Sequence, residues 1–350
     1  MSPRWRSLLA RVLPWLVVPI ILYWLARTVS LQEAWQILAG LDARLLLALI
    51  LLNVLILVTL SGRWWLILRA LGHRIPYLSL TGYRLGAFGI SYFTPGPQFG
   101  GEPLQVALPE KHNQVPRTTA VASVTLDKSL ELLVNFAFLA ISVAVILRFG
   151  VISASTGLLA GLVALALLAL PVLYLLAIWR GRTPLTGALR LLDHLPFPDN
   201  WRPRYRQARD GMQASETQVV TFCREQTGVL FLALGVSLFS WIAMVAEFWL
   251  ALRLLGVTLS VPHVMVALAA ARLALLAAVP GALGTLEASQ VLVLGALGVN
   301  PAVGLSLGIL IRLRDVFVAG TGLWWGTRKV RESGLKSDPA PASTHLGEIT

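Results

Sequence analysis

Long apolar runs dominate the chain, and shorter polar or charged stretches separate them. A helix needs about 20 mostly apolar residues to cross the ~30 Å hydrocarbon core of a bilayer, and several runs approach or exceed that length. Six spans are predicted, at about 8–26, 45–61, 118–147, 155–179, 228–254 and 303–325. The alternating pattern typical of a membrane β-barrel is absent from the sequence. The predicted fold class is therefore an all-α polytopic membrane protein.

Composition agrees with this fold class and argues against several kinds of site. Of 350 residues, 56% are hydrophobic and 13% are charged, which is more apolar than a soluble core of this size can bury. The single cysteine, Cys223, excludes an internal disulfide, and the five histidines lack metal-ligand spacing. The sequence contains no P-loop motif for nucleotide phosphates. We therefore expect no metal and no cofactor.

Arginine and lysine positions predict the orientation of the spans. With the N-terminus inside, the basic stretches at 4–11, 62–74, 111–117, 180–226 and 327–336 all lie on the cytoplasmic side. The outside would hold Arg27, Arg44, Arg148 and Arg253. Both termini are thus predicted to be cytoplasmic. The net charge of +12 then belongs to loops near anionic lipid, and no nucleic-acid partner is expected.

Two segments must enter and leave the membrane on the same side for this topology to hold. They cover about 77–108 and 262–298, and each is predicted to be a re-entrant helical hairpin within a single domain, 1–330. The 180–226 stretch is interpreted as a cytoplasmic basic connector lying on headgroups, with a specific lipid or partner site as the alternative. The tail, 331–350, is predicted to be disordered.

The two hairpins share a motif of helix breakers followed by an acid and an amide. The pattern P-G-x5-E-x-x-Q occurs in both with identical spacing. Its members are Pro95, Gly96, Glu102 and Gln105 in the first hairpin and Pro280, Gly281, Glu287 and Gln290 in the second, with Gly100, Gly101 and Gly284 as further breakers. Two such breaks opening to opposite sides predict an inverted-topology repeat, as in many transporters.

Each break should start a new helix with the glutamate in its first turn. Proline removes a backbone donor, and freed backbone groups at membrane depth survive only against protein or water. Glu102 and Glu287 could then simply satisfy their own helix's amides and dipole. Alternatively, each could meet a headgroup amine, an arginine across the repeat or a proton. Both interpretations can hold together.

Charged residues also occur within apolar surroundings, where each costs on the order of 3 kcal/mol at a helix centre. They are Arg84, Asp127, Lys128, Glu131, Arg272, Arg312, Arg314 and Asp315. Arg84 and Arg272 precede the two breaks, and Asp127 and Asp315 follow them. Local pairs three residues apart, Lys128 with Glu131 and Arg312 with Asp315, could neutralise part of the set. The alternative is a polar cleft that holds a phospholipid headgroup, since arginine binds phosphate through two parallel hydrogen bonds.

The stretches "FGGEPLQVALPEKHNQVPRTTAVASVTLDKSLELL" and "VPGALGTLEASQVLVLGALGV" resemble the flippase-like transmembrane domain of the lysylphosphatidylglycerol synthase (multiple peptide resistance factor) family, over about 10–330. The resemblance implies a bacterial inner-membrane protein that moves a phospholipid or related amphiphile between leaflets. It also marks Glu102, Asp127, Lys128, Glu287 and Arg312 as candidate functional residues. Relatives commonly carry basic residues where this chain has Gln105 and Leu286, so headgroup preference is expected to differ.

Three functions therefore remain open at this point. The first is a lipid flippase or transporter, not an enzyme, with membrane phospholipids and a separate lipid-modifying enzyme as expected partners. The second is a membrane-embedded enzyme or accessory subunit acting on lipid or polyprenyl-linked substrates. The third is a scaffold that uses the basic connector. No counterpart of the synthases' aminoacyl-transferase domain is recognised after the last span, so the chain is not expected to make aminoacyl lipids itself.

Overall fold

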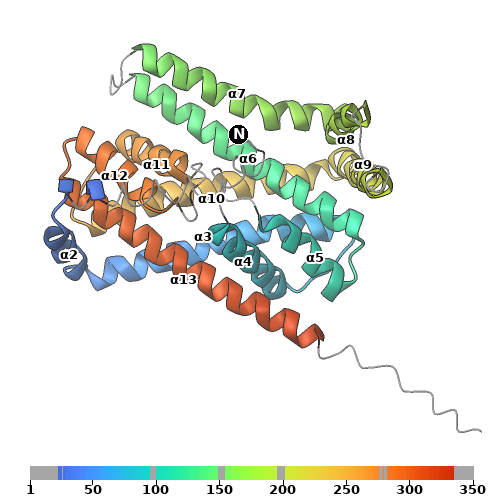
Figure 1. Ribbon diagram of the computed structural model, residues 1–350, viewed down its shortest axis with the longest axis horizontal. Coiled ribbons are helices and arrows are strands. Elements are labelled where there is room, and N and C mark those ends of the chain that lie inside the picture. Colours follow the sequence, from blue (N-terminus) through green and yellow to red (C-terminus); the bar gives the residue numbers. More distant parts are fainter. Residues whose placement is uncertain are drawn as a thin grey trace, which may run out of the picture.

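The structure is a computed structural model that describes residues 23–25, 27–94, 100–148, 154–194, 202–275, 279 and 282–334. Every secondary-structure element within these ranges is helical (Figure 1). The helices are α2 (Leu31–Ala39), α3 (Ala43–Ala70), α4 (Tyr77–Phe93), α5 (Glu102–Asn113), α6 (Arg117–Arg148), α7 (Ala154–Trp179), α8 (Pro184–Leu191), η1 (Leu192–His194), α9 (Arg202–Glu225), α10 (Thr227–Leu254), α11 (Val261–Leu275), α12 (Thr285–Ala296) and α13 (Pro301–Gly334). The predicted all-α class is confirmed.

Four of these helices are long and apolar enough to cross a membrane. They are α3, α6, α10 and the 158–179 part of α7, and they coincide with four of the six predicted spans. α13 covers the predicted span 303–325 but carries Arg312, Arg314 and Asp315 near its middle. Almost all of the predicted span 8–26 lies outside the described residues. The predicted tail starts slightly early, because α13 continues to Gly334.

The two predicted hairpins each contain a pair of shorter helices. α4 and α5 cover the first, and α11 and α12 cover the second, with 17, 12, 15 and 12 residues respectively. Each helix is shorter than the roughly 20 residues that a full crossing needs. A re-entrant path through the membrane stays a prediction. The breakers Pro95, Gly96, Pro280 and Gly281 lie outside the described residues.

The helix boundaries of α3–α6 recur in α10–α13, and we call these two sets the first and second half. α3, α4 and α6 begin at residues 43, 77 and 117, and α10, α11 and α13 begin 184 positions later, at 227, 261 and 301. Backbone turns with positive φ recur at the same separation. They pair Gly72 with Gly256, Gly100 with Gly284, and Gln114 with Gly298. The second half therefore repeats the local folding plan of the first.

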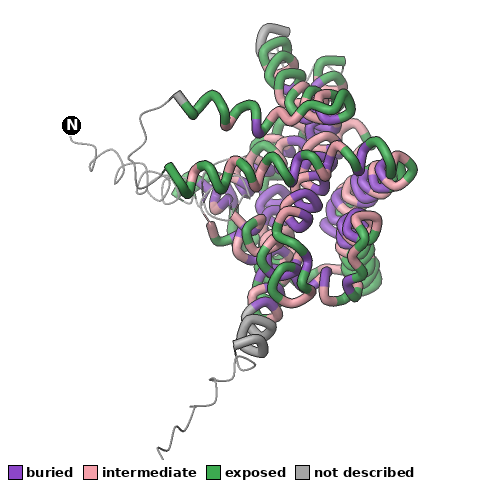
Figure 2. The backbone as a smooth tube through the Cα atoms, turned by 90° about the vertical axis from the view of Figure 1, so that its right-hand side faces the viewer, coloured by how far each residue is buried: buried purple, intermediate pink, exposed green. Residues whose placement is uncertain are grey.

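Helices of the two halves pack against each other through the centre of the bundle. α3 lies along α10, and α4 lies along α13. Small residues allow membrane helices to approach closely. A Cβ atom at Gly322 would lie 2.0 Å from the Leu85 carbonyl oxygen, and one at Gly89 would lie 2.7 Å from the Ala319 carbonyl oxygen. Figure 2 shows buried residues concentrated in the middle of this bundle and exposed residues along its periphery.

The predicted basic connector between α7 and α10 is largely helical in its described residues. It contains α8, η1 and α9, and α9 packs against α6 and α7. Glu216 of α9 is 1% exposed and accepts hydrogen bonds from the backbone N–H groups of Leu185 and Thr186 and from the Thr186 hydroxyl, at 2.9, 2.7 and 2.6 Å. This carboxylate satisfies the otherwise unpaired donors at the start of α8.

Candidate functional site

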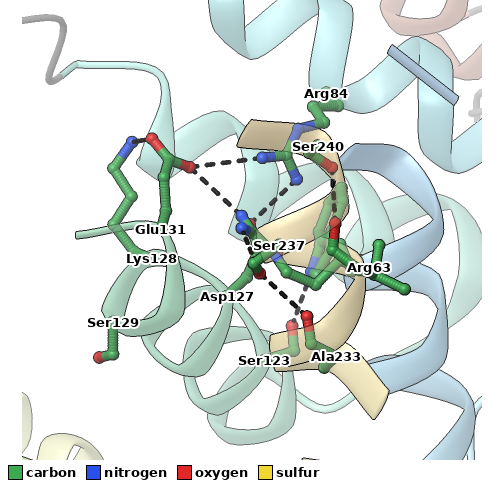
Figure 3. A network of polar contacts seen from close by, with 12 residues as sticks. Arg63, Arg84, Ser123, Asp127, Lys128, Ser129, Glu131, Ala233, Ser237 and Ser240 are labelled. Carbon is green, nitrogen blue, oxygen red and sulfur yellow. Dashed lines mark hydrogen bonds and ion pairs between the residues drawn. The ribbon is translucent and has the colours of Figure 1, made fainter. Parts of the chain in front are cut away.

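A network of charged side chains lies between α3, α4 and α6 (Figure 3). Arg63 Nε contacts Asp127 Oδ1 at 2.6 Å, and Arg84 Nη1 contacts Asp127 Oδ2 at 3.0 Å. Both guanidinium groups also reach Glu131 Oε2, each at 3.4 Å, as the two arginines and two carboxylates in Figure 3 point toward one another. Arg63 is 1% exposed and Asp127 is 2% exposed. Burial of these charges is tolerable because each has an opposite charge within hydrogen-bond distance.

Lys128 extends this network to the start of α5. Its Nζ atom lies 3.0 Å from Glu131 Oε1, confirming the pair predicted from their spacing, and 3.4 Å from Glu102 Oε1. The other oxygen of Glu102 accepts a hydrogen bond from the Gly100 backbone N–H at 2.8 Å. The first-turn glutamate therefore both satisfies its own helix start and meets a cation from α6.

The corresponding acid of the second half is held by a single arginine. Arg312 of α13 makes two hydrogen bonds to Glu287, at 2.5 Å from Nε and 2.9 Å from Nη2. The same guanidinium donates to the Ala282 carbonyl oxygen at 3.1 Å and to the Tyr92 hydroxyl of α4 at 3.4 Å. Arg312 thus links the start of α12 to the end of α4, so the two hairpins meet at this side chain.

A second ion-pair group of this half lies between α10 and α13. Arg314 pairs with Glu247 of α10, and its Nη2 lies 2.8 Å from Asp315 Oδ1. Arg314 Nη1 also donates to Asn53 Oδ1 of α3 at 3.4 Å. Arg63 makes the matching contact in the other direction, from Nη1 to the Ser237 hydroxyl of α10 at 3.1 Å. Each half therefore sends an arginine toward the other half's long helix.

Arg272 of α11 differs from the other interior arginines. Its Nη2 contacts the Met244 sulfur at 3.2 Å, and its guanidinium carbon lies 5.0 Å from the centre of the Trp241 ring. Among the described residues, no carboxylate lies within ion-pair distance of it, and its buried Nε–H has no hydrogen-bond acceptor. A cation over an indole ring gains about 2 kcal/mol when desolvated, which offsets only part of the cost of burying a charge.

A family described as "Lysylphosphatidylglycerol synthase TM region" matches residues 11–321. The chain belongs to this family. It is also 23% identical over 280 residues to a "UPF0104 membrane protein" of Methanothermobacter thermautotrophicus, covering 78% of this chain and 81% of that protein. The matched range includes both halves and both charged groups, so the resemblance predicted from the motifs is confirmed.

The motif amides of this family member occupy different environments. Gln290 is fully buried, with Nε2 donating to the Ala267 carbonyl oxygen at 3.3 Å and to the Ser289 hydroxyl at 3.1 Å. Gln105 lies in the first turn of α5, where its backbone N–H donates to the Gly101 carbonyl oxygen at 3.1 Å. Gln290 therefore anchors α12 on α11. The two glutamines of the motif do not make the same contact in the two halves.

Helix boundaries correct the pairing of charges between the two halves. From their order along the chain, Asp127 and Asp315 are predicted to be equivalent positions. The 184-residue separation instead makes Ile311 the equivalent of Asp127, and Asp315 the equivalent of Glu131. It also pairs Lys128 with Arg312, and these two side chains bind the motif acids Glu102 and Glu287, which lie 185 residues apart. The two residues of the suggested Arg312–Asp315 pair have other partners, because Arg312 pairs with Glu287 and Asp315 pairs with its chain neighbour Arg314.

The sequence did not mark Arg63 or Glu247 as candidate site residues. The same separation makes them equivalent positions of the two halves. The predicted span ends at about residue 61, which places Arg63 in the cytoplasmic basic stretch 62–74. α3 instead continues to Ala70, which places Arg63 inside the bundle. The signal that could have found both is the repeat of W-L-x-L-R-x-L-G at 65–72 and 249–256.

That repeated stretch forms the same contact in both halves. Arg69 lies over the ring of Trp65 at 5.0 Å, and Arg253 lies over the ring of Trp249 at 4.2 Å. Each helix ends one residue after the arginine, at Ala70 or Leu254, in a turn whose hydrogen bonds also match. Tryptophan and arginine at a helix end are typical of a membrane interface. The two stretches therefore mark matching ends of α3 and α10.

Other candidate sites lie apart from these charges. Within the described ranges, no group of three His, Cys, Asp or Glu side chains could hold a metal ion. A cavity of about 280 Å³ lies where the ends of α3 and α9 meet α6 and α10, and its lining includes Thr119, Thr221, Glu225 and Gln226. None of the interior ion pairs borders it. The charged groups around α5 and α12 are therefore the candidate functional site.

Proposed function

We propose that this family member is a lipid transporter that moves a phospholipid or related amphiphile between the leaflets of a bacterial inner membrane. The observation that carries the proposal is the pair of acids at the starts of α5 and α12, each bound to a cation of a neighbouring long helix. Headgroups carry charges that cannot cross hydrocarbon unaided. A polar route through the bundle lowers that barrier.

We further propose that the two halves form an inverted repeat. The recurring helix boundaries, positive-φ turns and Trp–Arg contacts support a duplication. The positive-inside pattern supports opposite orientations of the halves, with both termini cytoplasmic. In this arrangement the breaks before α5 and α12 open toward opposite leaflets, which is the geometry expected for alternating access.

Glu102 and Lys128 are the proposed first contact for a headgroup. Their side chains are 26% and 25% exposed, whereas Glu287 is 8% exposed in its pair with Arg312. An ion pair at 3.4 Å in a partly exposed position can exchange partners at small cost. A zwitterionic headgroup could therefore take over both partners, with its phosphate near Lys128 and its amine near Glu102.

Fluorescent phospholipids in proteoliposomes test the proposal. Wild-type protein should raise leaflet exchange above that of empty vesicles, measured as dithionite-quenched fluorescence. Glu102→Gln and Glu287→Gln should each reduce the exchange rate, because both remove a charge that the headgroup or its cation uses. Leu292→Gln, at an exposed position of α12, is the control that should keep wild-type exchange.

A lack of leaflet exchange above that of empty vesicles would overturn the proposal. If several headgroups, with and without a proton gradient, exchange no faster than in empty vesicles, the transporter function is wrong. The alternative function, an enzyme or accessory subunit acting on lipid or polyprenyl-linked substrates, would then be favoured. In that case a separate lipid-modifying enzyme should co-purify with the protein. If both glutamine variants exchange lipid normally, the acids only satisfy their helix starts.

A further inference from the structure

Arg272 has hydrogen-bonding capacity that the described residues leave unused. A guanidinium carries five N–H donors, and a thioether sulfur is a weak acceptor. Arg272 spends one donor on the Met244 sulfur, and its buried Nε–H is unbound within the described part of the chain. By contrast, Arg63, Arg84, Arg312 and Arg314 each have a carboxylate within 3.4 Å. Arg272 is thus the interior arginine with donors to offer a ligand.

Charged groups of both signs surround Arg272. Arg314 is within electrostatic range and adds positive charge. Glu247, Asp315 and Glu131 are also within that range and oppose an anion. All three carboxylates are already bound to other cations, Glu247 and Asp315 to Arg314, and Glu131 to Lys128. Because Arg314 alone serves both Glu247 and Asp315, that group keeps a net charge of −1, which Arg272 balances at longer range.

The first half has no equivalent of this group. The 184-residue separation places Phe88 opposite Arg272. The nearby arginine of the first half, Arg84, is engaged by both Asp127 and Glu131. An open guanidinium is thus a property of the second half alone, which the duplicated scaffold does not require.

We propose that Arg272 is a phosphate-binding residue, which takes a phosphate oxyanion through its paired N–H groups and gives up the Met244 contact in exchange. Arginine suits this role because its planar fork matches two phosphate oxygens. This assignment rests on the proposed transport function, in which the phosphate is part of the headgroup of the carried lipid. Free inorganic phosphate offers the same chemistry and is separated from it by experiment.

Trp241 supplies a direct report of binding, because its ring lies against the Arg272 guanidinium. Dihexanoyl phosphatidylglycerol added to detergent-solubilised protein should change the intrinsic fluorescence in a saturable way. Trp241→Phe should remove this change and leave the signal of the other tryptophans. Arg272→Gln should weaken apparent affinity at least tenfold, and Arg272→Lys, which keeps the charge without the fork, should weaken it less.

The control arms separate the phosphate from the rest of the lipid. Dihexanoylglycerol, which lacks phosphate, should give no Trp241-dependent change. If inorganic phosphate alone gives the full response at similar concentration, the site binds free phosphate and the lipid assignment is wrong. Arg253→Gln is the matched variant, because Arg253 also lies over a tryptophan but at the end of α10, and it should bind like wild type.

Two outcomes would overturn the proposal without touching the transport function. Arg272→Gln protein that binds phosphatidylglycerol with wild-type affinity would exclude the site, as would an equal response to dihexanoylglycerol. Conversely, binding that depends on Arg272 in detergent, with no leaflet exchange in vesicles, would keep the site and refute transport. Should Arg272→Gln fail to fold, the affinity of the Arg272→Lys variant decides, and a value equal to wild type refutes the proposal.

Discussion

The first and second halves of the bundle share a scaffold but differ in how they hold charge. The starts of three helix pairs, three positive-φ turns and the Trp–Arg contacts recur at a separation of 184 residues. At one pair of equivalent positions, however, Arg63 of α3 corresponds to Glu247 of α10, so the two halves carry opposite charges there. The first half closes its charges into one network on Asp127 and Glu131, whereas the second spreads them over separate pairs and leaves Arg272 without a carboxylate partner among the described residues. The two halves share the turns that shape the backbone and differ in the charged side chains between them.

The largest expected effect concerns the orientation of the two halves, because an inverted repeat places equivalent residues on opposite faces of the membrane. Arg74 and Thr258 are exposed residues just after the matching ends of α3 and α10. With Cys223 replaced by serine, single cysteines at these two positions should react with impermeant maleimide from opposite faces of the membrane. Labelling of both from the same face in intact cells would contradict the inverted repeat.

The buried network of the first half should be the more fragile of the two. Arg63→Met leaves Asp127 with one of its two arginines in a fully buried position, and we expect a loss of about 3–5 kcal/mol in the free energy of unfolding. Glu247→Gln removes a more exposed pair and should cost about 1–2 kcal/mol. Equilibrium unfolding in mixed detergent micelles measures both values.

A double variant shows whether the buried charge causes that loss. Arg63→Met combined with Asp127→Leu removes both partners, so it should be less destabilising than Arg63→Met alone. Equal or greater destabilisation in the double variant would mean that packing around Arg63, and not an uncompensated carboxylate, explains the effect. The larger loss in the free energy of unfolding for Arg63→Met than for Glu247→Gln would then come from helix packing and not from charge.

The smallest test asks whether the turns of the two halves are energetically equivalent. Gly72 and Gly256 have φ values of 89° and 80°, and an added Cβ would meet nothing within 4 Å at either. Alanine at each should therefore cost about 1 kcal/mol, from backbone strain alone. Thermal unfolding should give equal losses for both. Gly187→Ala, within α8 and free of positive φ, should be neutral or stabilising.

The sequence predicted four long helices well because length and hydropathy act locally. It also placed Lys128 with Glu131, whose spacing on one helix fixes their contact. Arg63 escaped prediction because the apolar run before it ends early and Trp64–Trp65 looks interfacial, whereas Trp64 is fully buried. Contacts such as Arg63 with Asp127 depend on how distant helices pack, which no local pattern encodes.

The partners of the buried charges are made at different times during synthesis. Arg63 precedes Asp127 by 64 residues, and Glu247 precedes Arg314 by 67. At a translation rate of roughly 5–20 residues per second, α3 and α10 each wait about 3–13 s for the opposite charge to emerge from the ribosome. Release into lipid during that interval would strand a charge in hydrocarbon. Both helices must therefore stay beside the insertion channel until α6 or α13 arrives, and the near-equal spacing imposes the same delay twice on one chain.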